Sequence, residues 1–534
     1  MGDKGIYPKR KHSFWFRLSV FLLGSVVLLL ALVITFCVWD EHRSANAWES
    51  FSEEMQSMGY PMDVDLLFPA PPPEEENFAA IPFFKHLITS QDFFVDAWQV
   101  ASTLIHPHEV YIPRDLPERF WRHGYGWTPE DVRLILLTRG AIEHPEPAVN
   151  PQGNLQLFRY FDSHFNELKF ALDRTFCQFS VFFDLGPQYP YHHLETLHEV
   201  VVLLSARAVT YLHSGRSAEA LEDIIFVWEL IHKLDTDRTI TASLISESCF
   251  IYSIQPLWQG IAAHQWSGPQ LEKLQSELNR FDFIESFKKN FLFETLWIAN
   301  LHATLEVAWM ESFISGVMKV GSPLLQKQVS KTEFILEKLL SKIPMGWIRM
   351  NLIHLSRCAF AYADAVYQTE KHLIDPIEVK RKILDIDTTY GDTINPDRFV
   401  VAKFKDSLFS LEIPRIAAQG QAYVDMGKIA CALESLYLTE KKYPNSLSED
   451  SLQPQSESFP SDVTMGEESY VYQKTSRSFL LYSLAWDKLN NLGQIGETSS
   501  GMEDWVWPAA DLPVPGDAFF DRKYFSNPLY DHSQ

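Results

Sequence analysis

The longest apolar stretch of the chain lies near its start. Residues 18–39 contain no charged side chain, and only Ser19, Gly24, Ser25 and Thr35 interrupt a series of large apolar positions. A helix of these 22 residues would measure about 33 Å, and the hydrocarbon core of a bilayer is about 30 Å thick. Backbone groups inside lipid must satisfy their own hydrogen bonds, so the stretch predicts one membrane-spanning helix.

Beyond this stretch the pattern changes, first to helical spacing and then to prolines. Trp48, Phe51 and Met55 recur three to four residues apart, which predicts a short stalk helix over residues 45–59. Residues 68–76 follow and contain three consecutive prolines and three glutamates. Consecutive prolines favour the extended polyproline II conformation, so this segment is predicted to be a semi-rigid spacer.

From residue 81 to about residue 395 the pattern is predominantly helical. Thr128 stands directly before a proline and Ser267 two residues before one, and both positions predict helix N-termini. Residues 192–213 and 217–234 are apolar helical stretches separated by a Ser-Gly-Arg turn, which predicts a helical hairpin. Further helices are expected at residues 241–264, 283–320, 332–342 and 347–373.

The C-terminal part combines one amphipathic helix with short strands. An apolar stripe predicts a helix that packs on one side, and its opposite, polar face carries Gln421, Asp425, Lys428, Ser435 and Thr439. Residues 470–472 and 479–484 are aromatic and aliphatic, and the turn between them predicts a β-hairpin. A third short strand is expected at residues 505–507.

These patterns predict a mainly α protein with an N-terminal transmembrane helix, an α-helical body and a small C-terminal α+β module. The expected segments are a basic leader (1–17), the transmembrane helix (18–39), a stalk helix and Pro-rich spacer (40–80), the α-helical body (81–395), a helix plus antiparallel sheet (396–508) and a Pro/aromatic tail (509–534).

Charges on either side of the apolar stretch indicate its orientation. The leader carries five basic residues against one acidic residue, whereas acidic residues dominate directly after residue 39. The positive-inside rule therefore predicts a single-pass anchor in the bacterial cytoplasmic (inner) membrane, with a cytoplasmic N-terminus and an extracytoplasmic body. A cleavable signal peptide, cut near Ala45-Asn46-Ala47, is the alternative, but the apolar stretch is longer than such a peptide needs.

The overall composition narrows the expected partners. The net charge is −23 at pH 7, and a body of that sign repels phosphate backbones, so no nucleic acid is expected. The lipid bilayer and other envelope proteins are the partners that remain. Five cysteines form no CxxC pair. The four outside the apolar stretch are expected to be buried free thiols, and a disulfide in an oxidising envelope is the alternative.

A recognisable order of motifs runs through the C-terminal part. Its stretches are Ala-Leu-Glu-Ser-Leu-Tyr at 432–437, Lys-Tyr-Pro-Asn-Ser-Leu at 442–447, Leu-Tyr-Ser at 481–483 and Asp-Trp at 504–505. This order resembles the globular domain of the major pseudopilin of type II secretion systems, which implies a pseudopilin-like module. The whole layout is similar to a group of bacterial envelope proteins without an assigned activity, with matching pieces at residues 77–79, 265–267 and 504–507.

The same resemblance implies a candidate calcium loop. In the pseudopilin the loop after Leu-Tyr-Ser binds calcium, and the equivalent residues here are 486–497. The candidate ligands are Asp487, Asn490, Asn491 and Glu497. Calcium takes about six to eight oxygen ligands, and Lys488 and Leu489 stand where acids would help. For that reason we favour a loop without an ion, and calcium is the one candidate cofactor.

A second candidate metal site lies on the predicted hairpin. Glu195-x-x-His198 and Glu229-x-x-His232 are two Glu-x-x-His motifs, and each histidine lies 17 residues from Gly215. Antiparallel pairing would bring them to the same level, and di-iron bundles use two such motifs plus two further glutamates. We favour the alternative that these are ordinary polar residues, because glutamate and histidine are common on helices.

Motifs of the common enzyme classes are missing from the sequence. There is no Gly-x-Ser-x-Gly, no His-Glu-x-x-His and no Gly-x-x-x-x-Gly-Lys. We therefore expect an interaction or scaffolding role in the cell envelope rather than an enzyme. The alternative function is a helical-bundle metalloprotein facing the periplasm.

Overall fold

Most of the chain is described by a computed structural model. The described residues are 12–62, 72–84, 126–139, 141, 147–179, 192–304, 345–391, 395, 397–398, 409–447, 459–475, 478–493 and 504–507. Within them the protein is mainly α-helical, with one small sheet, as the sequence predicts. Several predicted segments lie outside the described residues: the start of the spacer (68–71), the end of the predicted helix 283–320 (305–320), the predicted helix at 332–342 and the tail at 509–534.

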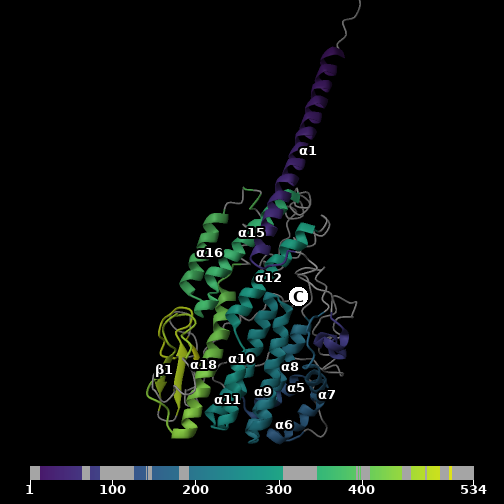
Figure 1. The fold of residues 1–534 in the computed structure, drawn as a ribbon. Coiled ribbons are helices and arrows are strands. Elements are labelled where there is room, and N and C mark those ends of the chain that lie inside the picture. Colours follow the sequence, from purple (N-terminus) through teal and green to yellow (C-terminus); the bar gives the residue numbers. More distant parts are fainter. Residues whose placement is uncertain are drawn as a thin grey trace, which may run out of the picture.

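The N-terminal helix α1 runs from His12 to Ser57 and contains 46 residues. It passes through the apolar stretch and the predicted stalk without a break, so the two are one helix. Its N-terminal part is long and apolar enough to span a membrane, and its large apolar side chains between Leu18 and Trp39 are exposed. Figure 1 shows α1 projecting from the rest of the molecule.

The described part of the body is built mainly from helices. They are α5 (Pro129–Thr138), α6 (Pro151–Phe158), α7 (Asp162–Ala171), α8 (His192–His213), α9 (Ser217–Leu234), α10 (Ile240–Ala262), α11 (Gly268–Leu278), α12 (Phe283–Thr304), α15 (Met345–Val366) and α16 (Pro376–Tyr390). Short 3-10 helices are η1 (Glu74–Glu76), η2 (Phe78–Ala80), η4 (Arg159–Phe161), η6 (Asp235–Asp237) and η7 (Thr369–Lys371).

Local signals explain where several of these helices begin and end. At α5 the Thr128 hydroxyl accepts from the backbone N–H of Asp131 at 3.2 Å, and the Asp131 carboxylate accepts from the N–H of Thr128 at 3.0 Å. Ser267 forms the equivalent capping box with Gln270 at the start of α11. Gly215 joins α8 to α9 with a positive φ of 70°, a conformation that glycine adopts without strain. The hairpin has the bounds that the sequence predicts.

One continuous core joins these helices. α8 packs against α9 and α10, α12 packs against α15, and α15 packs in turn against α1. Trp228 of α9 stacks near Phe250 of α10, with ring centroids 6.4 Å apart. Cys249, Cys358 and Cys431 are buried in this core as free thiols, whereas the free thiol of Cys177 is partly exposed.

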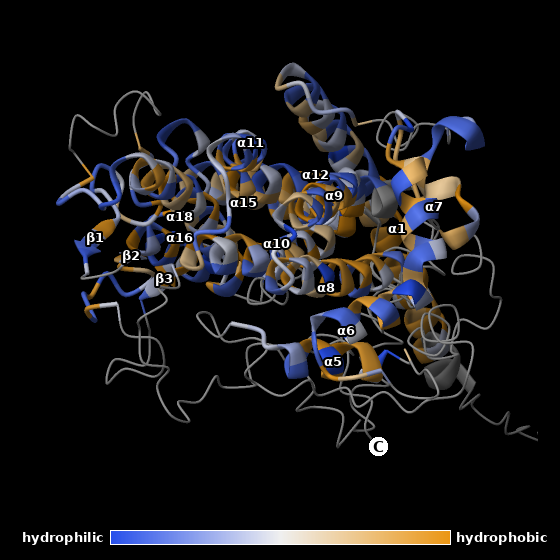
Figure 2. Ribbon diagram, turned by 90° about the horizontal axis from the view of Figure 1, so that it is seen from below, coloured by the Kyte–Doolittle hydropathy of each residue, from blue (hydrophilic) through white to orange (hydrophobic). Residues whose placement is uncertain are grey.

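The C-terminal part consists of α18 (Glu412–Glu440) and the strands β1 (Val471–Lys474), β2 (Phe479–Ser483) and β3 (Trp505–Trp507). The sheet is antiparallel in the order β1-β2-β3, with Tyr482 opposite both Val471 and Val506. α18 lies between this sheet and the helices α10, α11 and α12. Seen from below in Figure 2, the strands occupy one end of the molecule and α7 the other.

Two sequence expectations differ from the structure. Gln421 and Asp425, assigned to a polar face of α18, are fully buried, because α18 is covered on both sides. The end of the predicted spacer is not extended: Glu74–Glu76 form η1. Arg174 donates to the carbonyl oxygen of Glu74 at 2.8 Å, and the next residue, Asn77, pairs with Phe176 in a parallel bridge. This part of the segment is therefore fixed to the body.

Candidate functional site

Two buried carboxylates on α18 form the centre of the polar interior. Asp425 and Glu434 both have fully buried side chains. They lie nine residues apart, and at about 100° per residue they point to opposite sides of the helix. An ionised carboxylate in the interior is costly unless it is hydrogen-bonded, so its partners decide what it does.

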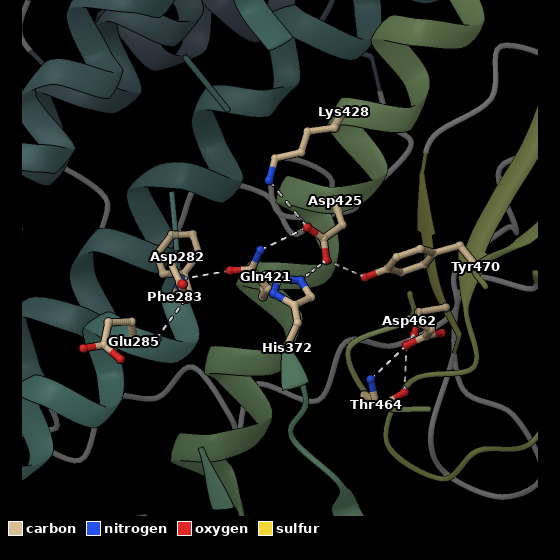
Figure 3. A network of polar contacts seen from close by, with 11 residues as sticks. Asp282, Phe283, Glu285, His372, Gln421, Asp425, Lys428, Asp462, Thr464 and Tyr470 are labelled. Atoms are coloured by element: carbon tan, nitrogen blue, oxygen red, sulfur yellow. Dashed lines mark hydrogen bonds and ion pairs between the residues drawn. The ribbon is translucent and has the colours of Figure 1, made fainter. Parts of the chain in front are cut away.

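Asp425 accepts hydrogen bonds from three elements. Its Oδ2 lies 2.7 Å from Nε2 of His372 and 3.0 Å from the hydroxyl of Tyr470, and its Oδ1 accepts from the Gln421 amide at 3.0 Å. The Lys428 ammonium lies 3.8 Å from Oδ1. Figure 3 shows these four side chains directed at Asp425. The carboxylate therefore ties together α18, the segment after α15 and the segment that precedes β1.

Gln421 extends this network into the body. Its side-chain oxygen accepts from the backbone N–H of Phe283 at 2.9 Å, at the start of α12 (Figure 3). The amide is thus satisfied at both ends, by Asp425 and by the first turn of α12. A second buried acid, Asp462, accepts from the hydroxyls of Thr464 and Ser483 at 2.9 and 3.0 Å and orders the loop beside β2.

His372 is more exposed than the other side chains around Asp425. Its side chain is 34% exposed, and its backbone has a positive φ of 52°. Burial by itself lowers the pKa of His372. The hydrogen bond and the negative charge of Asp425 outweigh it, so the pKa lies above the usual value. Asp425 therefore stabilises the protonated ring and holds its orientation.

Glu434 has a closely similar arrangement on the opposite side of α18. Its oxygens accept from Nδ1 of His264 and from the hydroxyl of Tyr443, both at 2.9 Å. The His264 ring stacks on Tyr437 at 4.2 Å between centroids, and its backbone also has a φ of 52°. Burial raises the pKa of Glu434 above its usual value, although His264 and Tyr443 oppose the shift. Each carboxylate–histidine–tyrosine cluster is thus a tie between α18 and a neighbouring segment.

The candidate calcium ligands lie in the loop after β2. Asn490 Oδ1 accepts from the Tyr482 hydroxyl at 3.0 Å and from the N–H of Leu492 at 2.8 Å. Asp487 Oδ1 accepts from the N–H of Leu489 at 2.9 Å, and Asn491 donates its backbone N–H to Asp504 at 3.0 Å. Glu497 lies outside the described residues. Oδ1 of Asp487 and Oδ1 of Asn490 thus each accept from a protein donor, and calcium binding stays a prediction.

The second sequence-predicted site is divided among different partners. His198 Nε2 lies 3.1 Å from the Ser248 hydroxyl, the Glu229 carboxylate pairs with Arg280, and the His232 ring stacks on Phe281 at 4.4 Å. The side chain of Glu195 lies outside the described residues. Among the described residues, no group of three or more His, Cys, Asp or Glu side chains is arranged to hold a metal ion. The di-metal site also stays a prediction.

Sequence reasoning missed the two clusters on α18. A signal was present, since both carboxylates stand beside uninterrupted apolar or small residues, 422–424 next to Asp425 and 429–433 next to Glu434. An acid that is buried together with such residues must have a partner. Neither the identity of that partner nor its distance along the chain follows from the sequence.

Comparisons with known proteins give no match, so the proposed function is based on the structure and the sequence alone. No protein-family model, no curated protein and no solved structure matches the chain.

Proposed function

We propose that this chain is a single-pass protein of the bacterial cytoplasmic membrane, with its body on the extracytoplasmic side, where it acts as a scaffold for other envelope proteins. The observation that carries the proposal is the uninterrupted helix α1. Its exposed apolar part suits lipid, and its polar continuation is held by the body. The basic leader and the acidic residues after Trp39 favour this orientation.

The contacts around residues 40–54 support a rigid connection between anchor and body. Arg43 donates to Asp397 at 2.8 Å and to Asp40 at 2.9 Å, and the hydrogen bond with Asp397 raises the pKa of Arg43 above its usual value. Arg357 of α15 pairs with Glu54 at 2.6 Å. These ties follow α1 for about 20 Å beyond the apolar stretch. A scaffold needs such a fixed position relative to the membrane.

α16 presents apolar surface that a protein partner could cover. Ile377 and Leu384 lie seven residues apart on one face of this helix, and they are 65% and 63% exposed. Large aliphatic side chains grouped on an exposed face are a feature of protein contacts. This pair supports the scaffold proposal and gives it a place to be tested.

A reporter behind Gln534 tests the orientation. An enzyme that folds only outside the cytoplasm should be active there, and one that works only in the cytoplasm should be inactive. Deleting residues 18–39 should reverse both results, because the charge pattern acts only on a stretch that inserts. Cytoplasmic activity of the full-length fusion would refute the proposal.

A covalent capture experiment tests the scaffold role. A photoreactive residue at position 377 or 384 should give a discrete adduct with another membrane or envelope protein in whole cells. The exposed Thr389 is the matched control position, because it lies about 120° from Ile377 and about 140° from Leu384 around α16. An adduct pattern that is the same at all three positions, or no adduct at any, would count against a partner on this face.

A further inference from the structure

The first turn of α15 lies beside the outer end of the apolar stretch. The rings of Trp347 and Phe36 meet edge to face, with centroids 6.0 Å apart. Phe36 is three residues before Trp39, and therefore about 4.5 Å inside the end of the stretch. α15 packs along α1 from this point (Figure 1). Trp347 consequently stands at the same level as residues that suit lipid.

The two residues after Trp347 differ in character: the first is apolar and buried, and the second is charged. Ile348, the next residue, is buried in a cluster with Leu352, against which Trp48 packs, so this side of α15 faces the body. Arg349 pairs with Glu41, just beyond the apolar stretch. The boundary between apolar and charged residues thus falls at residues 39–40 on α1 and at residues 347–349 on α15.

The side chains at this level are also of the kinds found at a membrane boundary. The Arg43 guanidinium lies 5.2 Å from the centroid of the Trp39 ring, so a tryptophan, an arginine and Trp347 gather at one level. Tryptophan side chains prefer the boundary between hydrocarbon and head groups, where the ring is apolar and the N–H can reach water.

We propose that the first turn of α15, with Trp347 at its tip, is a second contact between this protein and the bilayer, at the head-group boundary of the outer leaflet. The contact rests on the anchoring by α1 that is proposed above. A single transmembrane helix can tilt in the bilayer, and the body that is fixed to it tilts with it. A second contact several residues away on another helix fixes the tilt of the body against the membrane.

Quenching of tryptophan fluorescence tests this contact in the full-length protein. The chain is reconstituted into phosphatidylcholine vesicles whose acyl chains are brominated close to the head group, and compared with the same protein in unbrominated vesicles. Trp15, Trp39 and Trp347 would all lie near a boundary, so W347F should remove about one third of the bilayer-dependent quenching. W39F should have a similar effect.

The matched control is W48F. Trp48 lies on the same helix about 14 Å beyond Trp39 and packs against the body, so its loss should leave the quenching unchanged. Unchanged quenching in W347F, together with reduced quenching in W39F, would overturn the second contact but leave the anchor intact. Unchanged quenching in both variants would overturn the membrane anchor and, with it, the second contact. Circular dichroism of each variant verifies that the helices are retained.

Discussion

Glu247 of α10 lies in the interior against Gly420 of α18: a Cβ added to this glycine would stand 2.8 Å from Cγ of Glu247. Burial raises the pKa of its carboxyl to about 8, although the positive charge of Arg415 opposes the shift. Near neutral pH this side chain is therefore mostly protonated in the folded protein, whereas in the unfolded chain it is ionised. Folding is then coupled to the uptake of a proton.

This coupling predicts a dependence of stability on pH. The folded state binds more protons than the unfolded state, so the free energy of unfolding should fall as pH rises from about 4.5 to about 8. E247Q should keep the shape of the side chain and remove its titration, giving a higher melting temperature than the wild type at pH 8 and little difference at pH 4.5. Thermal unfolding in detergent at both pH values measures this.

The exposed Glu272 provides the control, because E272Q lies on the adjacent α11 and removes the same formal charge. Glu294, whose pKa burial raises to about 7, adds a slope of the same sign, so E247Q should reduce the pH dependence without abolishing it. A wild-type slope in E247Q would show that Glu247 is ionised in the folded protein.

The raised pKa of His372 predicts a second decrease in the free energy of unfolding as pH rises. Its folded pKa lies above the unfolded value of about 6.5, so its stabilising contribution is complete below that pH and is lost as pH rises through the folded pKa. H372Q should cost about 1 kcal/mol at pH 6, after allowance for solvent at the partly exposed ring, and less at pH 9. Urea unfolding of H372Q, D425N and the double variant, each at both pH values, gives the interaction free energy between His372 and Asp425. Equal losses at both pH values would exclude a protonated ring.

The burial and the partners of these side chains could not be predicted from the sequence. Asp425 and Gln421 have the spacing of a polar face, and the sequence analysis assigned them to one. Asp425 is buried because His372 and Tyr470, 53 and 45 residues away, supply its donors. Contacts between distant segments leave no local signal, so the two ties on α18 became visible only in the fold.

At the scale of elements, local signals were more informative. The bounds of α8 and α9, the capping of α5 and α11, and the β1–β2 hairpin depend on turn residues and on periodicity within one element, and these the sequence predicts. The continuity of α1 was not predicted, because the stalk pattern and the apolar stretch differ in composition. A helix needs no change of backbone where its side chains change from apolar to polar.

The crossing of α1 and α15 depends on a single glycine. A Cβ at Gly346 would stand 2.7 Å from the carbonyl oxygen of Asp40 and would overlap the Asp40 carboxylate. G346A should therefore force the two helices apart and cost about 1–3 kcal/mol. Loss of protection against proteolysis at the α1–α15 contact measures this. G268A is the control, since no heavy atom lies within 4 Å of a Cβ at that position, and it should leave the digestion pattern unchanged.

At the scale of the whole molecule, α18 packs against the helices of the body on one side and against the sheet on the other. A Cβ at Gly427 would meet Leu278 of α11 at 3.2 Å and Trp507 of β3 at 3.5 Å. Body and sheet are therefore separated at this point by the thickness of one helix. The buried Asp425 also connects the body with the sheet, since Gln421 links it to α12 while Tyr470 links it to the segment before β1.

This arrangement predicts that the C-terminal module does not fold alone. A fragment from Phe409 to Trp507 would expose the face of α18 that α10, α11 and α12 cover in the full chain, and it would leave Gln421 without Phe283. Burial of apolar area is the main stabilising term, and a small unit that loses one covered face has little reserve. The fragment should aggregate or show no cooperative melting, whereas the full chain should melt cooperatively. A soluble fragment with a sharp transition would mean that α18 and the sheet are a self-sufficient domain and that the contacts with α10, α11 and α12 form only after it has folded.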